Sequence, residues 1–533
     1  MASSSEESTT RKGFLGIDIG TQGLSALLID HDSLQVIGKG EAQYGMVDNL
    51  DNGCYEQNAQ DWEDALVDSM KQLREQVPGM EVLAIGIAGQ MHGEVLMDEQ
   101  GHVIGTVRLW CDARNEEEGM ELTNKLGRKV PKRMTSARFL WTIRNKPDVA
   151  RKTRHMNTPA GWMAFRLSNQ HSLGIGDASG MFPVSQKSMN YDTELLNKFD
   201  AIVREQDQSI APLESILPKV LVAGETTGLL TSEAAKLLGL HEGIPVAPAE
   251  GDQPAALAGS FIGSPGTVSC SFGTSVCANS VGDREFKGVS DSVDHFCASD
   301  GKPINMIWLR NGTTFLNSVV SSYGQMLQNS AESNDDIKPS AFDVIMPKLV
   351  KAPPNCGGLL ALPFMDDEPG LHVSSGGSAM IVGWNESNAK PENVARAALM
   401  STCFNLRIGS EVLDEQGYPR KRMVLTGGLA KTPECGQIIA DVFNTPTELQ
   451  LDSSDEGSGF GACLMATFLY HKTKADAKME GDWTDFLETR RKNRSKLLYY
   501  DPNPEHVSVV NDMFQRYKKL LTLVPQLTEA VKK

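Results

Sequence analysis

Close to its N-terminus the chain reads FLGIDIGTQGLSALLID over residues 14–30. Two apolar, β-prone runs flank a Gly-Thr-Gln-Gly turn, which is the pattern of a β-hairpin. Glycine tolerates a positive φ, so we expect Gly20 and Gly23 to supply that conformation in the turn. A third strand is predicted at residues 34–40. The stretch therefore indicates a sheet that begins with consecutive antiparallel strands.

The same turn carries a chemical hypothesis. In it, the backbone N–H groups of Gly20, Thr21 and Gln22 face a phosphate, while Asp18 at the strand end faces a cation. The alternative is a plain hairpin, since turns of this kind are common.

The later half of the chain begins in a similar way, because residues 266–278 read GTVSCSFGTSVCA. This second turn places Gly273 and Thr274 where the first has Gly20 and Thr21. Two halves with the same candidate phosphate turn indicate two related domains that face one another across a cleft and grip one polyphosphate.

The size and charge of the chain agree with two domains and limit its partners. A length of 533 residues is too great for one core and favours two domains of about 250 residues each. We expect a disordered tail over residues 1–12, an N-terminal domain over 13–262 and a C-terminal domain over 263–533. With 51 basic and 68 acidic residues, the net charge of −17 offers no basic field for nucleic acid or an anionic membrane.

The cysteines and the first residues favour a reducing compartment. Nine cysteines are scattered from Cys54 to Cys463 without a C-x-x-C pair, which argues against a disulfide framework and against a zinc site. Residues 1–11 lack the apolar run of a secretory signal. They carry acidic residues, in which transit peptides are usually poor, and import into a mitochondrion or plastid is the alternative. No stretch is apolar for long enough to span a bilayer. We expect a cytoplasmic protein without a membrane partner, and the sequence leaves open whether it forms a homodimer.

A carboxylate stands between the two halves. Residues 249–256 read AEGDQPAA, which places Asp252 on a glycine turn where a run of small residues begins a helix. One interpretation is a catalytic base, and the other is an ordinary N-cap aspartate, because Asp is a preferred cap. On the first interpretation, the helix N-terminus is expected to keep Asp252 ionised and ready to accept a proton.

Two stretches of the first half offer groups that suit a sugar. A predicted buried strand leads into residues 89–94, GQMHGE, where His92 either meets a polyol hydroxyl or simply holds the loop. Farther along, Trp110, Asp112 and Arg114 bring together an aromatic face, a carboxylate and a guanidinium, which match the apolar face and the hydroxyls of a sugar. The alternative is a core tryptophan, with Asp112 and Arg114 paired at the surface.

Two further glycine-rich stretches are interpreted from their surroundings. Gly427 and Gly428 lie between a predicted buried strand and a helix start, with Thr432 as the cap and Pro433 as the first helical residue. Adjacent glycines let a flat ring approach the backbone, and tight helix packing without a ligand fits equally well. Residues 174–180, GIGDASG, lack a clear preceding strand and following helix, so we interpret them as a turn.

Taken in series, these motifs resemble the FGGY family of carbohydrate kinases, and the resemblance runs from about Gly13 to Ala466. The matching segments are GIDIGT at 16–21, GQMHG at 89–93, GDQ at 251–253, FGTS at 272–275 and TGG at 426–428. Within the family, the loop at 89–93 followed by a Trp-x-Asp-x-Arg segment is most similar to members that phosphorylate D-xylulose with ATP.

The resemblance implies a fold and a set of roles. The fold is α/β, with two actin-like (ribonuclease H-like) domains that close over ATP and sugar in a central cleft. By motif match, Asp252 acts as the general base and Asp18 organises Mg²⁺. The residues that would contact the sugar are Met91, His92, Asp252 and Gln253 by motif match, together with Trp110 and Arg114. The residues that would bind the nucleotide are Thr21, Gln22, Gly273, Thr274, Gly427 and Gly428.

Three places depart from the members that act on xylulose. Gln253 stands where those members often have Asn, Ala160-Gly161 replaces a Lys-Asp pair, and residues 366–369 (DDEP) occupy the region of a Gly-Glu-Arg-like segment. We expect an ATP-dependent kinase for a ketopentose, with D-xylulose preferred. The alternatives are a kinase for another ketose or a polyol, such as ribulose or a pentitol, and a non-catalytic actin-like protein that binds nucleotide or sugar.

Overall fold

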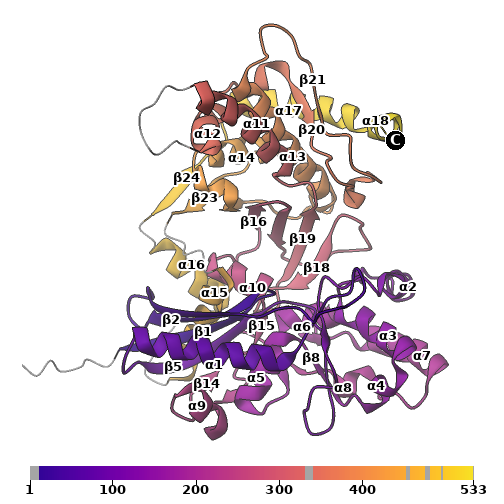
Figure 1. The fold of residues 1–533 in the computed structure, drawn as a ribbon, viewed down its shortest axis with the longest axis vertical. Helices are drawn as coiled ribbons and strands as arrows, with labels where there is room; N and C mark the ends of the chain where they lie inside the picture. The colour runs from indigo at the N-terminus through magenta and orange to yellow at the C-terminus, as the bar shows by residue number, and fades with distance from the viewer. Residues whose placement is uncertain (1–10, 331–339, 452–456, 475–480, 494–495, 532–533) are drawn as a thin grey trace, which may run out of the picture.

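A computed structural model describes residues 11–330, 340–451, 457–474, 481–493 and 496–531. It consists of two α/β halves stacked along the long axis of the molecule (Figure 1). Residues 1–10 of the predicted tail lie outside the described residues. The first strand already begins at Lys12, one residue before the predicted start of the N-terminal domain.

The first sheet has the predicted antiparallel start. Strands β1 (Lys12–Ile19), β2 (Gly23–Asp30) and β3 (Val36–Gln43) form a meander, and the hairpin expected over residues 14–30 is confirmed. On the other side of β1, strand β5 (Glu81–Gly89) runs parallel to it. The sheet is completed by β14 (Pro245–Val246), β13 (Gly228–Leu229) and β15 (Glu250–Gly251).

The second sheet repeats this plan. Its strands lie in the order β18-β19-β17-β16-β22-β23-β24, with β16 antiparallel to β17 and parallel to β22. Their bounds are β16 (Thr267–Phe272), β17 (Val276–Val281), β18 (Asp294–Cys297), β19 (Pro303–Leu309), β22 (Arg422–Gly427), β23 (Thr447–Gln450) and β24 (Leu497–Tyr500). Both halves thus start with antiparallel strands joined by a Gly-Thr turn and continue with a parallel strand, as the repeated motif predicts.

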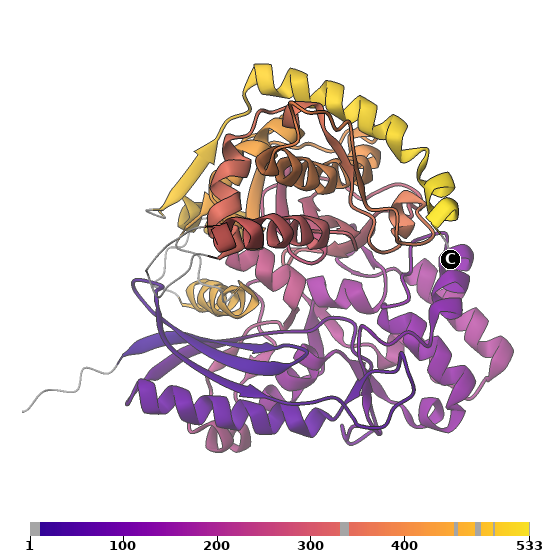
Figure 2. The ribbon, with the colours of Figure 1, turned by 45° about the horizontal axis from the view of Figure 1, so that its top comes forward.

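Helices cover both sheets, and short strands lie in the connections. The helices are α1 (Ala59–Gln76), α2 (Glu116–Leu126), α3 (Thr135–Asn145), α4 (Pro147–Lys152), α5 (Pro159–Ser168), α6 (Ile175–Met181), α7 (Thr193–Gln206), α8 (Leu213–Ile216), α9 (Ser232–Leu238), α10 (Asp252–Gly259), α11 (Thr314–Ser330), α12 (Ala341–Lys351), α13 (Pro391–Glu415), α14 (Cys435–Phe443), α15 (Gly457–Thr473), α16 (Trp483–Lys492), α17 (Pro504–Leu521) and α18 (Val524–Val531). The short strands are β4 (Glu56–Gln57), β6 (Val95–Met97), β7 (Val107–Arg108), β8 (His155–Asn157), β9 (Ser172–Gly174), β10 (Val184–Ser185), β11 (Asn190–Tyr191), β12 (Lys219–Leu221), β20 (Leu360–Leu362) and β21 (Met380–Val382), with 3₁₀ turns η1 (Cys356–Gly358), η2 (Pro369–Leu371) and η3 (Gly428–Lys431). In Figure 2 the yellow α17 and α18 run across the outer side of the second half.

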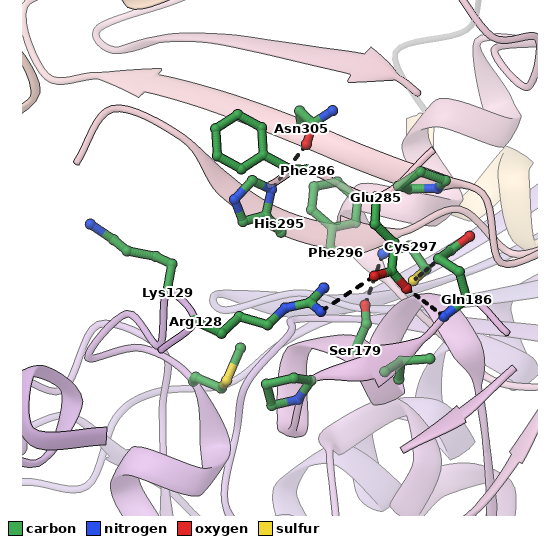
Figure 3. Close-up of a pocket in the computed structure, with 14 residues that line it drawn as sticks. Arg128, Lys129, Ser179, Gln186, Glu285, Phe286, His295, Phe296, Cys297 and Asn305 are labelled. Carbon is green, nitrogen blue, oxygen red and sulfur yellow. Dashed lines mark hydrogen bonds and ion pairs between the residues drawn. The ribbon is translucent and has the colours of Figure 1, made fainter. Parts of the chain in front are cut away.

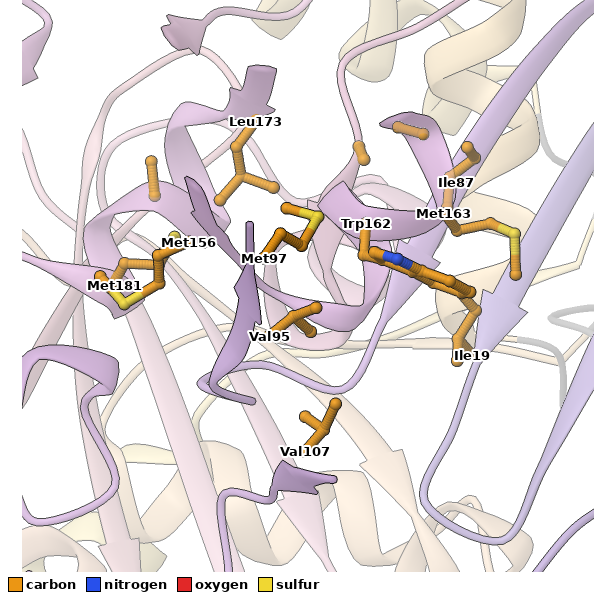
Figure 4. Packing of buried hydrophobic residues seen from close by; sticks show 14 of the residues in the cluster. Ile19, Ile87, Val95, Met97, Val107, Met156, Trp162, Met163, Leu173 and Met181 are labelled. Atoms are coloured by element: carbon orange, nitrogen blue, oxygen red, sulfur yellow. The ribbon is translucent and has the colours of Figure 1, made fainter. Parts of the chain in front are cut away.

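The core of the first half forms as its apolar spacing predicts. Helix α1 buries Trp62, Leu66 and Met70, which recur every three or four residues on one face. Figure 4 shows another part of the same core, where the Trp162 ring lies beside Ile19 near the carboxyl end of β1. Burial of these apolar side chains fixes the strand ends, and the strand ends carry the predicted site.

One helix from the later half packs on the first sheet. Helix α15 lies against β1 and β5 and packs beside α10 between the two halves (Figure 1). A side chain at Gly16 would overlap the backbone of Gly459, and one at Gly86 would overlap Ala462. These strand glycines therefore let the helix approach closely. The predicted domain boundary at residue 262 divides the chain in sequence. Helix α15 comes after this boundary but packs on the sheet that comes before it.

Three local expectations are corrected by the structure, and one strand is additional. The predicted turn at 174–180 is helix α6, whose N-terminal N–H groups are bound by the buried Glu250 carboxylate. The helix expected to start at Pro433 begins at Cys435. Gly20 and Gly23 do not have positive φ; instead, a Cβ atom on Gly23 would lie 2.6 Å from the Ala42 carbonyl oxygen. Strand β24, beyond Lys472, was not predicted.

Candidate active site

The predicted residues of the first half meet at one edge of its sheet. In the parallel register Ile19 and Gly251 both lie level with Gly89, so the three strands β1, β5 and β15 end together. The next residues are the Gly20 turn, the Gln90–His92 loop and Asp252. The carboxyl ends of parallel strands are where α/β folds bind their ligands.

The second half has the matching edge. Phe272 at the end of β16 lies level with Gly427 at the end of β22, so the Gly273–Ser275 turn and Gly428 are neighbours. Gly427 and Gly428 are exposed, and Gly427 has φ 75°, a conformation that glycine adopts without strain. The structure thus leaves this stretch of backbone open to a ligand, and the alternative of tight helix packing does not hold for Gly427 and Gly428.

Two hydrogen bonds connect these edges across the halves. The Ser458 hydroxyl, at the start of α15, donates to Asp18 Oδ2. The Asn279 amide, on β17, donates to Gln253 Oε1 over 3.4 Å. Asp18 and the residue beside Asp252 are therefore held by groups from the second half of the chain.

Asp252 is the first residue of α10, and Gly251 is its N-cap, so the cap interpretation is wrong by one position. The expectation that the helix N-terminus keeps it fully ionised is also wrong. Burial raises the pKa of Asp252 to about 7, and the negative charge of Asp18 adds to this effect, outweighing the Gln253 N–H bond that lowers it. A carboxyl with this pKa can change its protonation state near neutral pH.

Two further carboxyls lie behind Asp252, and sequence reasoning did not select them. Asp177 on α6 is fully buried and accepts a 2.5 Å hydrogen bond from the Thr158 hydroxyl, while Glu250 accepts 2.8 Å and 3.2 Å bonds from N–H groups at the start of α6. Burial raises the pKa of both groups to about 8. The position of Glu250 two residues before Asp252 was the only signal in the sequence.

His92 is neutral and oriented by α6. It has φ 69°, and its Nδ1 lies 2.8 Å from the Gly180 carbonyl oxygen, which can only accept. The Nδ1 atom must therefore carry the proton, which leaves Nε2 as an acceptor. Burial and the charge of Arg133 lower the pKa of His92 to about 3. Its neighbour Met91 is buried against Gly251.

The first turn is held by side chains from several elements. The Thr21 hydroxyl donates to Gln90 Oε1 at 3.3 Å, and Gln57 Nε2 donates to the Thr21 carbonyl at 2.7 Å. The Tyr44 hydroxyl donates to the Gly20 carbonyl at 2.6 Å. Tying the Gly20 and Thr21 carbonyl groups down in this way fixes the directions of the Thr21 and Gln22 N–H groups, and Gln22 is exposed. The expectation for the Gly20 N–H is wrong, because this group donates to the Gly23 carbonyl oxygen at 2.9 Å.

Trp110 and Arg114 behave differently from each other. The Trp110 side chain is 46% exposed, and its Nε1 donates to the Thr21 hydroxyl at 3.1 Å, so it lies beside the first turn rather than in the core. Arg114 donates to Asp112 at 2.6 Å and to Glu56 at 2.5 Å. The pairing expected between Asp112 and Arg114 is present, although Asp112 is buried rather than at the surface.

A separate pocket marks the contact between the halves (Figure 3). Its walls include Arg128 and Ser179 from the first half and His295 and Cys297 from the second. The Cys297 N–H donates to the Ser179 hydroxyl oxygen at 2.8 Å and so joins α6 to β18. None of the predicted site residues lines this pocket, which we therefore distinguish from the active site.

The fold and the strand-end site define a class of protein, a two-domain actin-like phosphotransferase. Comparison with protein families makes this specific. The N-terminal domain model of the FGGY family of carbohydrate kinases matches residues 14–259, and the C-terminal domain model of that family matches residues 268–470. The chain belongs to this family. It is a carbohydrate kinase, which takes a sugar and ATP as small-molecule substrates.

Individual relatives cover the chain from end to end. A curated protein of Haemophilus influenzae named xylulose kinase is 26% identical over an alignment 542 positions long. The alignment covers 96% of this chain and 100% of the relative. The crystal structure of xylulose kinase from Rhodospirillum rubrum matches with a TM-score of 0.78 and 19% identity, covering 97% of this chain and 100% of that one. The crystal structure of gluconate kinase from Lactobacillus acidophilus matches with a TM-score of 0.76 and 19% identity, covering 98% and 100%. The two structural likenesses establish the fold.

In the part of the chain that the structure describes, none of the helices combines the length and the apolar character needed to cross a bilayer.

Proposed function

We propose that this kinase phosphorylates a ketopentose, with D-xylulose preferred, and that Asp252 is the general base. The observation that carries the proposal is the position of Asp252. Asp252, a half-buried residue, lies at the same sheet edge as the Gly20 turn and His92, and its neighbour Gln253 is bonded to the second half. A pKa of about 7 suits a base that works near neutral pH.

The proposed reaction draws on groups from both halves. A sugar hydroxyl oxygen attacks the γ-phosphorus of ATP, the bond to the ADP oxygen breaks, and the hydroxyl proton passes to Asp252. The turns at Thr21-Gln22 and Gly273-Thr274 would hold phosphate oxygens. In the second turn the N–H groups of Thr274 and Ser275 would do so, because the Gly273 N–H donates to the Ser275 carbonyl oxygen at 3.0 Å. Gly427 and Gly428, which are exposed at the end of β22, would line the adenosine pocket.

Mg²⁺ fits the donor set of this edge. Among the described residues there is no group of three or more His, Cys, Asp and Glu side chains suited to a metal ion. Mg²⁺ commonly binds through one or two carboxylates, substrate phosphates and water, and Asp18 at the end of β1 supplies one carboxylate. The ion would neutralise phosphate charge during transfer.

Besides Asp252, we propose that five residues contact the sugar: Met91, His92, Trp110, Arg114 and Gln253. The Nε2 of neutral His92 can accept a hydrogen bond from a sugar hydroxyl, because Nδ1 is already bonded to Gly180. Trp110 presents an exposed ring beside the first turn. The Arg114 guanidinium is already bound to Asp112 and Glu56, which leaves it fewer donors for a sugar hydroxyl.

The choice of D-xylulose rests on relatives whose matched regions cover 96% and 97% of this chain. The Haemophilus influenzae relative and the Rhodospirillum rubrum structure are both named xylulose kinase. Gln253 in place of Asn is the position at which we expect specificity to deviate, because an added methylene changes the reach of the amide. We also propose a cytoplasmic location, since the nine cysteines are scattered along the chain without a C-x-x-C pair, which suits a reducing compartment.

ADP release measured with MgATP over ketopentoses, ketohexoses, gluconate and polyols tests this proposal. We expect the highest kcat/KM with D-xylulose. A higher kcat/KM with ribulose or a pentitol would favour the alternative substrates. No ADP release with any sugar, by a folded protein that still binds ADP, would favour a non-catalytic binding protein instead.

A further inference from the structure

The second phosphate turn is held from behind by the chain segment that follows β19. The Gly312 N–H donates to the Thr274 carbonyl at 3.0 Å, and the Thr313 N–H donates to the Gly273 carbonyl at 2.8 Å. The Thr313 hydroxyl donates to the same Gly273 carbonyl at 2.8 Å. Both carbonyl groups of the turn therefore point toward residues 312–313.

This direction of the carbonyl groups fixes the N–H groups. In a trans peptide the N–H points opposite to the C=O of the same peptide unit. The N–H groups of Thr274 and Ser275 must then point away from residues 312–313. Within the described part of the chain, neither N–H donates a hydrogen bond, so both remain available to a phosphate oxygen.

The supporting segment is itself held by one buried carboxylate, Glu368. This residue is 1% exposed and accepts bonds from the Asn311 N–H at 2.8 Å and the Arg310 N–H at 3.1 Å. It also accepts a 3.1 Å bond from Asn311 Nδ2. Among the described residues no cation pairs with Glu368, because the Arg310 guanidinium pairs with the neighbouring Asp367.

A buried carboxylate is costly unless hydrogen bonds satisfy it, and here backbone N–H groups do so. Glu368 therefore fixes residues 310–311 in one arrangement, and the adjacent residues 312–313 inherit it. The carboxylate acts through this segment on the turn that follows β16, and it touches no substrate.

We propose that Glu368 is a positioning residue for phosphate binding, which it serves by orienting the Gly273–Ser275 turn through residues 310–313. The proposal rests on the proposed nucleotide role of this turn. It also gives a purpose to the acidic stretch at residues 366–369, where the chain departs from the pattern of similar kinases.

The test is the affinity for MgADP, measured by isothermal titration, beside the KM for the sugar. Glu368→Gln keeps the size of the side chain but turns an amide toward N–H donors. We expect MgADP affinity to fall roughly tenfold, as for the loss of a hydrogen bond to a charged group, while the sugar KM stays within about twofold. Asp367→Asn, which removes only the exposed ion pair with Arg310, should leave both unchanged.

Two other variants separate the possible failures. Gly273→Ala tests the turn itself, because the added Cβ lies at an ordinary 3.5 Å from the nearest backbone oxygen and so should not perturb folding. Unchanged MgADP affinity in Gly273→Ala would overturn both the phosphate role and the proposal. Weakened affinity there, with wild-type affinity in Glu368→Gln, would overturn the proposal alone. If Glu368→Gln does not fold, Glu368→Asp keeps the charge but shortens its reach, and equal losses for ADP and sugar would indicate a purely structural carboxylate.

Discussion

The proposed role of Asp252 depends on its protonation, because only the carboxylate can accept a proton. Asp252→Asn removes this capacity at nearly constant volume. We expect the variant to fold and to bind the sugar, while kcat falls at least about a hundredfold, the usual range for a positioned base. Steady-state ADP release and sugar titration measure the two properties. Near-normal kcat would rule Asp252 out as the base.

The raised pKa of Asp252 predicts the pH profile. Below about pH 7 the carboxyl becomes protonated, so kcat/KM for the sugar should fall about tenfold per pH unit on the acid side. Above pH 7 the base is ionised and the profile should level off. If kcat/KM instead stayed constant down to pH 5, the pKa of Asp252 would not be raised by burial and by the charge of Asp18.

His92 gives a selective prediction. His92→Ala removes the Nε2 acceptor, so the sugar KM should rise roughly threefold to tenfold, the worth of one neutral hydrogen bond, while the KM for ATP stays nearly constant. His102→Ala is a suitable control, because His102 lies in an exposed hairpin, where it pairs with Asp98. Equal changes in the two KM values would point to a structural histidine.

The sequence pattern indicated the site residues at strand ends but not the buried carboxyl groups behind them. Asp18, His92 and Asp252 could be selected because each adjoins an apolar strand or a glycine turn. Asp177 lies in a short run of small residues that has no pattern typical of a site. Tertiary packing alone places its carboxyl behind Asp252. The pKa of Asp252 likewise depends on burial and on Asp18, which lies more than two hundred residues earlier, so it could not be read from the local helix start.

Helix α15 shows how glycines in strands control packing between elements. Gly86→Ala would bring a methyl group into the Ala462 backbone, which is rigid helix, so the variant should lose at least about 1–3 kcal/mol of unfolding free energy. Urea denaturation measures the change. Gly45→Ala, where a Cβ meets nothing within 4 Å, is the matched control and should be nearly neutral. Equal midpoints for the two variants would contradict the close approach of α15.

Elements with a clear period were predictable, and short ones were not. Helix α1 and the two hairpins follow directly from apolar spacing. Helix α6 has seven residues, mostly small, with no amphipathic pattern, and the Glu250 carboxylate stabilises its first turn. Because an isolated helix of this length is unstable, tertiary contacts decide its formation. Strand β24 has only four residues and depends on β23 in the same way.

The buried acids predict how the stability of the whole molecule varies with pH. Asp177 and Glu250 have folded pKa values of about 8, well above those of exposed carboxyls near 4. Their contribution is complete below about pH 4 and is lost as pH rises toward 8, because the unfolded chain releases these protons first. Over this window the unfolding free energy should therefore decline with rising pH.

Urea unfolding between pH 5 and 9 tests this linkage. The double variant Asp177→Asn and Glu250→Gln removes both titrations, so its decline across the window should be shallower. Glu242→Gln changes an exposed carboxyl and should retain the wild-type slope. The same slope in all three proteins would show that the two acids ionise in the folded state as freely as in the unfolded chain.

The placement of α15 also has a consequence for biosynthesis. The sheet that begins at Lys12 receives one of its covering helices only when residues 457–473 have been made. At typical translation rates, the ribosome needs on the order of tens of seconds to extend the nascent chain from residue 262 to residue 473. During this interval the apolar face of β1 and β5 has no α15 to cover it. The first half can therefore complete the packing around its sheet only after residues 457–473 have been made.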